Sequence, residues 1–176
     1  AEGLAGMHIG YVQSGRVNIH DDVLLLPANG FGSAKSLQVM DDDVEVATAG
    51  DRVGLALRNT KEEHLTGSTI IVHPPVEDKR TNSSIPMALD KHMRSFVQLE
   101  TSPFQKRILA PGDVIHASVD LQFVVGRVVE TNDLQLTVDW EHPLFIRRES
   151  PPPVIIAQLD SIPRIMGSAV VTRVDE

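Results

Sequence analysis

The sequence predicts an all-β protein built from two small β-barrels in tandem. Short apolar segments rich in Val, Ile and Leu recur along the chain, and turn-forming residues separate them at close intervals. Aromatic residues make up only 4% of the 176 residues, and no apolar repeat at helical spacing is long enough for a major helix. A chain of this length provides two cores of roughly 75 and 85 residues, each of them small but feasible.

The first half of the chain predicts one barrel over residues 1–74, allowing for a truncated first strand. Pairs such as Ser14-Gly15, Asp21-Asp22 and Gly50-Asp51 favour tight turns between its strands. The expected strands are 7–13, 16–20, 23–27, 34–40, 52–58 and 68–73. The short polar piece 61–65 is expected to form one helical turn.

The stretch 75–90 is expected to be a linker or a long surface loop, because it is polar, bounded by prolines and has little to bury. A second barrel is predicted over residues 91–176. Its expected strands are 95–100, 114–119, 122–130, 134–140, 144–147, 154–159 and 165–174.

The charge balance limits the partners of the protein. With 24 acidic against 16 basic residues the formal charge is -8, which argues against indiscriminate adhesion to nucleic acid or anionic membrane but leaves room for a local basic face. No apolar run approaches the ~18 residues of a membrane span, and the absence of Cys excludes disulfides and thiolate zinc sites. We expect a cytoplasmic protein without a membrane partner and, because it opens with Ala1-Glu2-Gly3, a fragment of a longer chain.

The chain lacks the residue patterns of a catalytic site. It has no G-x-x-x-x-G-K-[ST] phosphate loop and no pair of histidines at zinc-binding spacing. The acidic run 41–43 lacks the glycine and the distal Glu of a calcium loop, so a hairpin tip explains it better. Asp139, Glu141 and His142 invite an acid–base role, but a turn before Pro143 explains the same residues. We expect neither catalytic residues nor a metal site in this chain.

The segment 52–58 alternates between two kinds of side chain, so its faces can be assigned. Val53, Leu55 and Leu57 are predicted to face the core. Small residues and cations share the other face: Arg52, Gly54, Ala56 and Arg58. Exposed backbone beside cations suits a phosphate chain or another domain, although a solvated face accounts for it equally well.

Four segments of the first half follow known patterns in order. They are 9–17 (IGYVQSGRV), 21–27 (DDVLLLP), 35–39 (KSLQV) and 49–58 (AGDRVGLALR). The segment 9–17 resembles the pattern G-x-V-x-x-G-x-[IV], and the segment 21–27 resembles G-D-x-[VL]-x-[VIL]-x-P, with Asp21 in place of Gly. The segment 35–39 resembles K-S-I-Q-[VM], and the segment 49–58 resembles A-G-D-[RN]-V-G-[LF]-x-L-[RK]. These patterns belong to the second domain of translational GTPases of the elongation factor Tu class, which the first barrel therefore resembles.

The second half is similar to the third domain of the same class. The segment 164–174 (RIMGSAVVTRV) resembles the closing strand R-T-V-G-x-G-V-V-T-x-[IV] of that domain. The segment 112–116 (GDVIH), followed by Leu121-Gln122, is more similar to the archaeal selenocysteine-specific elongation factor and its paralogues than to elongation factor Tu itself.

The resemblance implies a role in translation. It implies that the two barrels bind aminoacyl-tRNA, act on the ribosome and pack against a GTP-binding domain that this chain lacks. That domain would carry GTP and magnesium, so we expect no cofactor in this chain. Shape and phosphate contacts would dominate such binding. The matching positions are Gln38, Asp41, Arg52 and Arg58 for the acceptor end, and Ser161, Ile162 and Arg164 for the T-stem.

Two of these positions depart from the family pattern or have a structural alternative. The acceptor-end pocket of the family has an acidic residue and an Arg three positions later, where this chain has Gln38 and Asp41. Asp41 cannot attract a phosphate as Arg would. For Ile162 the alternative to a contact is a buried apolar position, and for Ser161 it is a surface loop.

A second hypothesis is a protein-interaction scaffold. Its barrels would only brace a GTPase, as in a paralogue such as the initiation factor gamma subunit or in a degenerate homologue that delivers no tRNA. The acidic net charge and Asp41 favour the scaffold, whereas Leu121-Gln122 favours the tRNA-binding factor.

Overall fold

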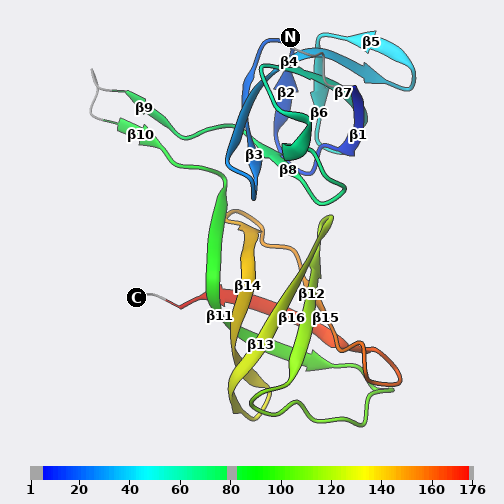
Figure 1. Ribbon diagram of the computed structural model, residues 1–176, viewed down its shortest axis with the longest axis vertical. Helices are drawn as coiled ribbons and strands as arrows, with labels where there is room; N and C mark the ends of the chain where they lie inside the picture. The colour runs from blue at the N-terminus through cyan, green and yellow to red at the C-terminus, as the bar shows by residue number, and fades with distance from the viewer. Residues whose placement is uncertain (1–5, 79–82, 175–176) are drawn as a thin grey trace. The chain divides into compact units, whose positions relative to one another are not determined.

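The computed structural model describes residues 6–78 and 83–174, and the chain divides into two compact units, Ala1–Met87 and Ala88–Glu176. Strands dominate both units (Figure 1), so the predicted all-β architecture of tandem barrels is confirmed. In the described ranges the only helical element is the 3-10 turn η1 (Glu62–His64), which lies inside the predicted helical turn. None of the described helical structure could cross a membrane.

Unit 1 is organised around one curved antiparallel sheet. Its strand order is β1-β7-β4-β3-β8, with β5 paired to β4, and a separate ladder joins β2 to β6 (Figure 1). The strands are β1 (Met7–Tyr11), β2 (Arg16–Asn18), β3 (Asp22–Leu26), β4 (Gly30–Val39), β5 (Asp42–Val44), β6 (Val46–Thr48), β7 (Arg52–Arg58) and β8 (Ile70–Val72). The ladder of β2 and β6 contacts β4, which places it against the sheet.

The core of unit 1 follows from strand alternation. Val53 and Leu55 are each 6% exposed and Leu57 is fully buried, so the predicted inward face of β7 is confirmed. Leu25 of β3 and Leu37 of β4 are members of the same apolar cluster. Burial of aliphatic side chains at about 25 cal/mol per Å² supplies the main stabilisation of such a small unit.

The stretch expected as a linker contains a hairpin. Strands β9 (Val76–Asp78) and β10 (Ser83–Ile85) pair antiparallel, and both belong to unit 1. An exposed two-stranded ladder satisfies its backbone groups without an apolar face of its own, which is why a polar, proline-bounded stretch can form one. The polar composition therefore did not exclude strands at this position.

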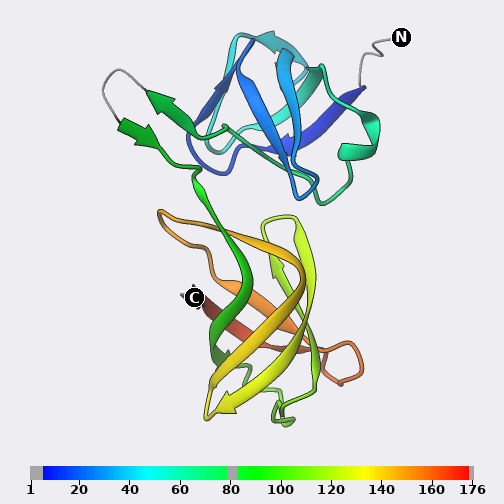
Figure 2. The same ribbon diagram turned by 60° about the vertical axis from the view of Figure 1, so that its left-hand side comes forward.

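Unit 2 is a closed antiparallel barrel with the strand order β11-β14-β13-β12-β15-β16, in which β16 returns to β11 (Figure 2). Its strands are β11 (Leu89–Thr101), β12 (Val114–Val119), β13 (Gln122–Asn132), β14 (Gln135–Arg147), β15 (Val154–Ala157) and β16 (Ile165–Arg173). Closure leaves no free sheet edge, and the inward apolar side chains of all six strands form one cluster.

Strand β14 corrects one expectation. The sequence predicted a turn before Pro143, but β14 runs through this position as a single strand. Arg94 pairs with Asp139 and His92 with Leu144, so residues 140–143 stand opposite Met93 alone. A bulge of this kind admits proline, because the residues inside it make no ladder hydrogen bonds to β11.

Candidate nucleic-acid interface

The first candidate surface lies on the outer face of the unit 1 sheet. Ile9 of β1 is the register partner of Gly54 on β7, which in turn pairs with Gln38 on β4. Tyr11 pairs with Arg52 at the next position of this face. Residues opposite one another in antiparallel strands share a face, so the structure brings Gln38 and Arg52 onto one surface with the exposed apolar side chains of β1.

Part of the outer face of β7 is covered. The sequence predicted exposed backbone at Gly54 and Ala56, but Ala56 is only 8% exposed. Met7 pairs with Ala56, and a Cβ atom at Gly54 would lie 3.1 Å from the Met7 sulfur. Strand β1 therefore lays an apolar side chain over this end of β7, and the open part of the face narrows to the region of Arg52.

The remaining acceptor-end positions do not gather at this surface. Arg58 ends β7, and its Nη2 lies 3.0 Å from Nδ1 of His20. Arg58 lies six positions after Arg52, which is about 20 Å along an extended strand. The structure thus places Arg58 in another environment.

Asp41 lies at the tip of the hairpin between β4 and β5. Met40 and Asp41 have φ angles of 52° and 68°, as expected for the two central residues of a tight hairpin turn. The Nε2 group of Gln38 donates a hydrogen bond of 2.9 Å to Oδ1 of Asp43. The side chain of Gln38 is therefore held within the hairpin of β4 and β5. The rim of the first candidate surface beside Gln38 carries the carboxylates of Asp41 and Asp43.

The second candidate surface is formed by two loops at one end of unit 2, residues 102–112 after β11 and residues 158–164 before β16. It carries the predicted T-stem residues, but their burial reverses the alternatives that the sequence offered. Ser161 is buried at 6% exposure, whereas Ile162 is 97% exposed. Arg164 is also exposed. An apolar side chain that stands in solvent beside a cation is available to a partner.

Gln105 joins the two loops. Its Nε2 donates to Oγ of Ser161 at 3.3 Å and to the carbonyl oxygen of Pro163 at 2.7 Å. Its Oε1 accepts hydrogen bonds of 2.9 Å from the backbone N–H groups of Lys106 and Arg107. One amide side chain thus fixes both loops, and Ser161 is a positioning residue rather than a contact residue.

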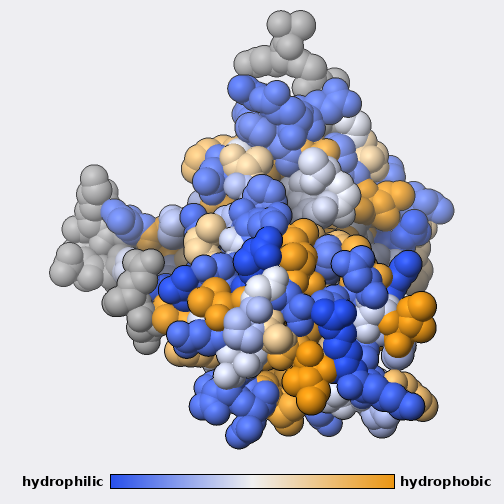
Figure 3. Space-filling model, turned by 60° about the horizontal axis from the view of Figure 1, so that its bottom comes forward, coloured by the Kyte–Doolittle hydropathy of each residue, from blue (hydrophilic) through white to orange (hydrophobic). Residues whose placement is uncertain are grey.

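The joined loops present a mixed apolar and basic surface, which we call the loop face: Phe104, Lys106, Arg107, Ile108, Ile162 and Arg164. Phe104 is 79% exposed and Ile108 is 86% exposed. Arg107 donates to Oδ1 of Asp113 at 2.8 Å, while no ion pair is found for Lys106 or Arg164 within the described ranges. Figure 3 looks toward this end of the molecule and shows hydrophobic side chains set among hydrophilic ones.

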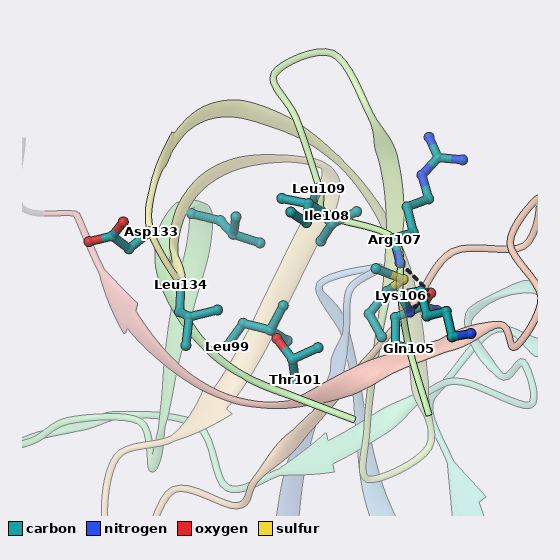
Figure 4. A pocket seen from close by; sticks show the side chains of 11 residues that line it. Leu99, Thr101, Gln105, Lys106, Arg107, Ile108, Leu109, Asp133 and Leu134 are labelled. Atoms are coloured by element: carbon teal, nitrogen blue, oxygen red, sulfur yellow. Dashed lines mark hydrogen bonds between the residues drawn. The ribbon is translucent and has the colours of Figure 1, made fainter. Parts of the chain in front are cut away.

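A small pocket of about 110 Å³ opens behind the loop face. Lys106, Arg107 and Ile108 lie on one side of it and Asp133 and Leu134 on the other (Figure 4). The sequence did not point to five residues of this region: Phe104, Gln105, Lys106, Arg107 and Ile108. Apolar residues beside cations in a proline-bounded turn region were the available signal, but their proximity to Ser161 depends on barrel closure.

The group Asp139, Glu141 and His142 does not form an acid–base site. Asp139 accepts hydrogen bonds from Nε of Arg94 and, at 2.7 Å, from Nη2 of Arg94. These bonds lower the pKa of Asp139 and raise that of Arg94. Glu141 and His142 are exposed. Asp139 is therefore a partner in a surface ion pair between β11 and β14.

A magnesium or phosphate site has requirements with which the described residues can be compared. Over the described ranges, no three or more His, Cys, Asp or Glu side chains come together as metal ligands would. The sequence has no phosphate loop, so the residues present do not fit the nucleotide and metal that the family resemblance implies for a separate domain.

Relatives of this chain are found among archaeal translation elongation factors. No family model matches the sequence. A selenocysteine-specific elongation factor of Methanocaldococcus jannaschii is 28% identical over 145 residues, which cover 82% of this chain and 28% of that protein. The elongation factor 1-alpha of Aeropyrum pernix is 22% identical over 93% of this chain and 37% of its own length.

An uncharacterized protein of M. jannaschii is a further relative, 28% identical over 70% of this chain and 36% of its own length. The chain therefore spans about a third of the curated relatives it matches. Among solved structures, the apo form of elongation factor SelB from Methanococcus maripaludis has a TM-score of 0.72 at 21% identity, over 97% of this chain and 40% of that one. The bacterial selenocysteine-specific factor EF-Sec has a TM-score of 0.69 at 16% identity, over 97% of this chain and 28% of that one.

These comparisons confirm the resemblance that the motifs indicated. The chain is homologous to part of archaeal translation elongation factors, with selenocysteine-specific factors and elongation factor 1-alpha among its relatives. Its fold is similar to that of a part of SelB and of EF-Sec.

Proposed function

We propose that the chain is the tRNA-holding, two-barrel portion of a specialised, selenocysteine-specific-like elongation factor. In this role it binds aminoacyl-tRNA, acts on the ribosome in the cytoplasm and packs against a GTP-binding domain. The observation that carries the proposal is the loop face. Gln105 fixes two loops that present unpaired cations beside exposed apolar side chains.

The chemistry of the loop face suits a helical RNA stem. Lys106 and Arg164 can each contact one phosphate, and proteins recognise RNA helices mainly by shape and by backbone and ribose contacts. Ile162 and Phe104 supply apolar surface for ribose or an accessible base edge. Because Gln105 fixes the loops beforehand, little conformational entropy is lost when RNA binds.

The outer face of unit 1 is proposed to lie near the acceptor end. Arg52 is exposed there beside Tyr11, which gives one cation and one aromatic side chain. Asp41 and its acidic neighbours stand at the rim. We propose that Arg52 attracts the terminal phosphates and that the acidic hairpin limits how far they reach, whereas Arg58 plays no part.

The test is the salt dependence of aminoacyl-tRNA binding by the intact parent protein, with and without GTP. Each phosphate contact that is lost should reduce the slope of log affinity against log salt by about 1. We expect Lys106→Ala and Arg164→Ala to reduce the slope, and Phe104→Ala to weaken binding while the slope stays unchanged.

Lys91→Ala is the matched control for Lys106→Ala. Lys91 is also exposed, and it lies near the start of β11, whereas the loop face follows the end of this 13-residue strand. At about 3.3 Å per residue, roughly 30 Å of strand separates the two lysines. Equal effects of the two substitutions, or no binding in either nucleotide state, would reject the proposal.

A domain-bracing scaffold is the second candidate function. On the first surface the Gln38 side chain bonds to the Asp43 carboxylate, and Asp41 lies at the tip of the same hairpin, where a phosphate-binding site would need cations. This candidate predicts that the parent protein binds no charged tRNA, although its barrels still bind the GTPase domain.

A further inference from the structure

The bulge between β11 and β14 brings three polar side chains together inside unit 2. His92 is 3% exposed, Ser95 is fully buried and Trp140 is 3% exposed. The Nε1 group of Trp140 donates to Oγ of Ser95 at 2.9 Å, and Nδ1 of His92 lies 3.1 Å from the same oxygen. A single hydroxyl therefore links an indole to an imidazole.

The direction of the hydrogen bonds follows from the chemistry of Trp140. An indole N–H can only donate, so the Ser95 hydroxyl accepts from Trp140 and can donate its own proton to His92. This assignment requires an unprotonated Nδ1 and therefore a neutral imidazole. When Nδ1 of His92 is protonated, Trp140 and His92 both present N–H donors to the Ser95 oxygen. The Ser95 hydroxyl proton then no longer has Nδ1 of His92 as its acceptor.

The surroundings also oppose a charge on His92. Burial is the main cause that lowers its pKa, the Asp90 carboxylate on β11 raises it, and Arg173 of β16 lowers it. Asp90 is itself paired with Arg148, with an Nη2 to Oδ1 distance of 2.8 Å.

Other charged groups nearby lie on the exposed side of the strands. Arg94 of β11 is paired with Asp139 of β14, and Glu141 and His142 stand exposed in the bulge.

The indole leaves little room for adjustment. Gly126 of β13 is the register partner of Trp140, and a Cβ atom at Gly126 would lie 2.5 Å from Cε3 of the ring. Residues 140–143 stand opposite Met93 alone, so no ladder bond to β11 holds this part of β14. Besides the surface ion pair of Arg94 with Asp139, the buried Trp140–Ser95 bond links the two strands there.

We propose that His92, Ser95 and Trp140 form a proton-sensitive latch that keeps the β11–β14 bulge closed while the imidazole is neutral and releases it when His92 takes up a proton. The latch shares no residue with the loop face or with the first candidate surface on unit 1, so it does not depend on tRNA binding. It makes the second barrel a candidate element for regulation by mild acid.

The sign of the effect is fixed by the direction of the pKa shift. Because the folded-state pKa of His92 is below 6.5, unit 2 should keep its full stability above pH 6.5 and lose stability as the pH falls through the lower folded value. Trp140 is the only tryptophan of the chain, so its fluorescence reports the latch directly.

The test is an acid titration of the whole chain followed by tryptophan emission and by the imidazole nitrogen signals of histidine in NMR. We expect a red shift of the emission with a midpoint below 6.5, coincident with the His92 signals, and Nδ1 unprotonated at neutral pH. His92→Gln should remove this transition. His142→Gln is the matched control, an exposed histidine two residues from the reporter, and it should leave the transition unchanged.

A transition that persists in His92→Gln, or one that disappears in His142→Gln, would overturn the proposal. If His92→Gln does not fold, the proposal is tested by the emission change of Ser95→Ala and by the His92 NMR titration of the unmodified chain. Ser95→Ala should uncouple the emission change from the His92 titration. A His92 that titrates at or above 6.5, or whose Nδ1 carries a proton at neutral pH, would equally reject the latch.

Discussion

Replacing Val53 by Asp should destabilise unit 1 by about 2.5–5 kcal/mol. Val53 is 6% exposed and packs in the apolar cluster of unit 1. Its removal forfeits about 1.5–2 kcal/mol of apolar burial. A buried carboxyl group without a hydrogen-bond partner costs about 1–3 kcal/mol more, even when it escapes its charge by taking up a proton.

The assay is urea unfolding with NMR amide signals that separate the two units, because a single overall transition is not guaranteed in a two-unit chain. Trp140 lies in unit 2 and should keep its own transition. Val46→Asp is the matched control, since Val46 is 42% exposed and lies in the same unit. If the two variants unfold at the same urea concentration, the faces of β7 have been assigned the wrong way round.

Three further predictions concern unit 2. Gly126→Ala should destabilise it by about 2–4 kcal/mol, because the new Cβ would meet both Trp140 and Val138 at under 3 Å; thermal melting by near-UV circular dichroism measures this. Gln122→Ala should cost about 2–4 kcal/mol, because the Gln122 amide bonds both the N–H and the C=O group of buried Phe145, while Gln98→Ala on an exposed strand face should change the melt little. Asp139 should titrate below its ordinary value in a carboxyl NMR titration, and Arg94→Ala should return it there. The small stability it supplies is then present above pH 3.8 and lost as the pH falls.

Strand faces could be predicted because the side-chain period of a strand depends on the local sequence alone. The burial of Val53, Leu55 and Leu57 follows from alternation within seven residues. The cover over Ala56 could not be predicted in this way. It depends on which strand pairs with the outer edge of β7, and Met7 lies almost fifty positions earlier in the chain.

The reversal of Ser161 and Ile162 has the same origin. As the alternative to a T-stem contact, hydrophobicity favoured a buried Ile162 and an exposed Ser161, since an isoleucine gains about 2–3 kcal/mol from burial. Barrel closure brings Gln105 to Ser161 across 56 positions, and their hydrogen bond satisfies the buried hydroxyl. Ile162 is then directed outward with its loop. No local sequence pattern predicts this hydrogen bond. The roles of Ile162 as a contact residue and Ser161 as a positioning residue therefore follow only from the three-dimensional structure.

The exposure of Ile162 also bears on the kind of partner. A single exposed apolar side chain is ordinary, but Phe104, Ile108 and Ile162 stand on two joined loops, each at least 79% exposed. A surface for phosphates alone would need only Lys106 and Arg164, and a hydrophobic protein interface would exclude unpaired cations from its centre. A partner that offers both anionic phosphates and apolar ribose or base surface satisfies the whole loop face. That combination is the physical reason to favour an RNA stem over a bracing domain at this end of the second barrel.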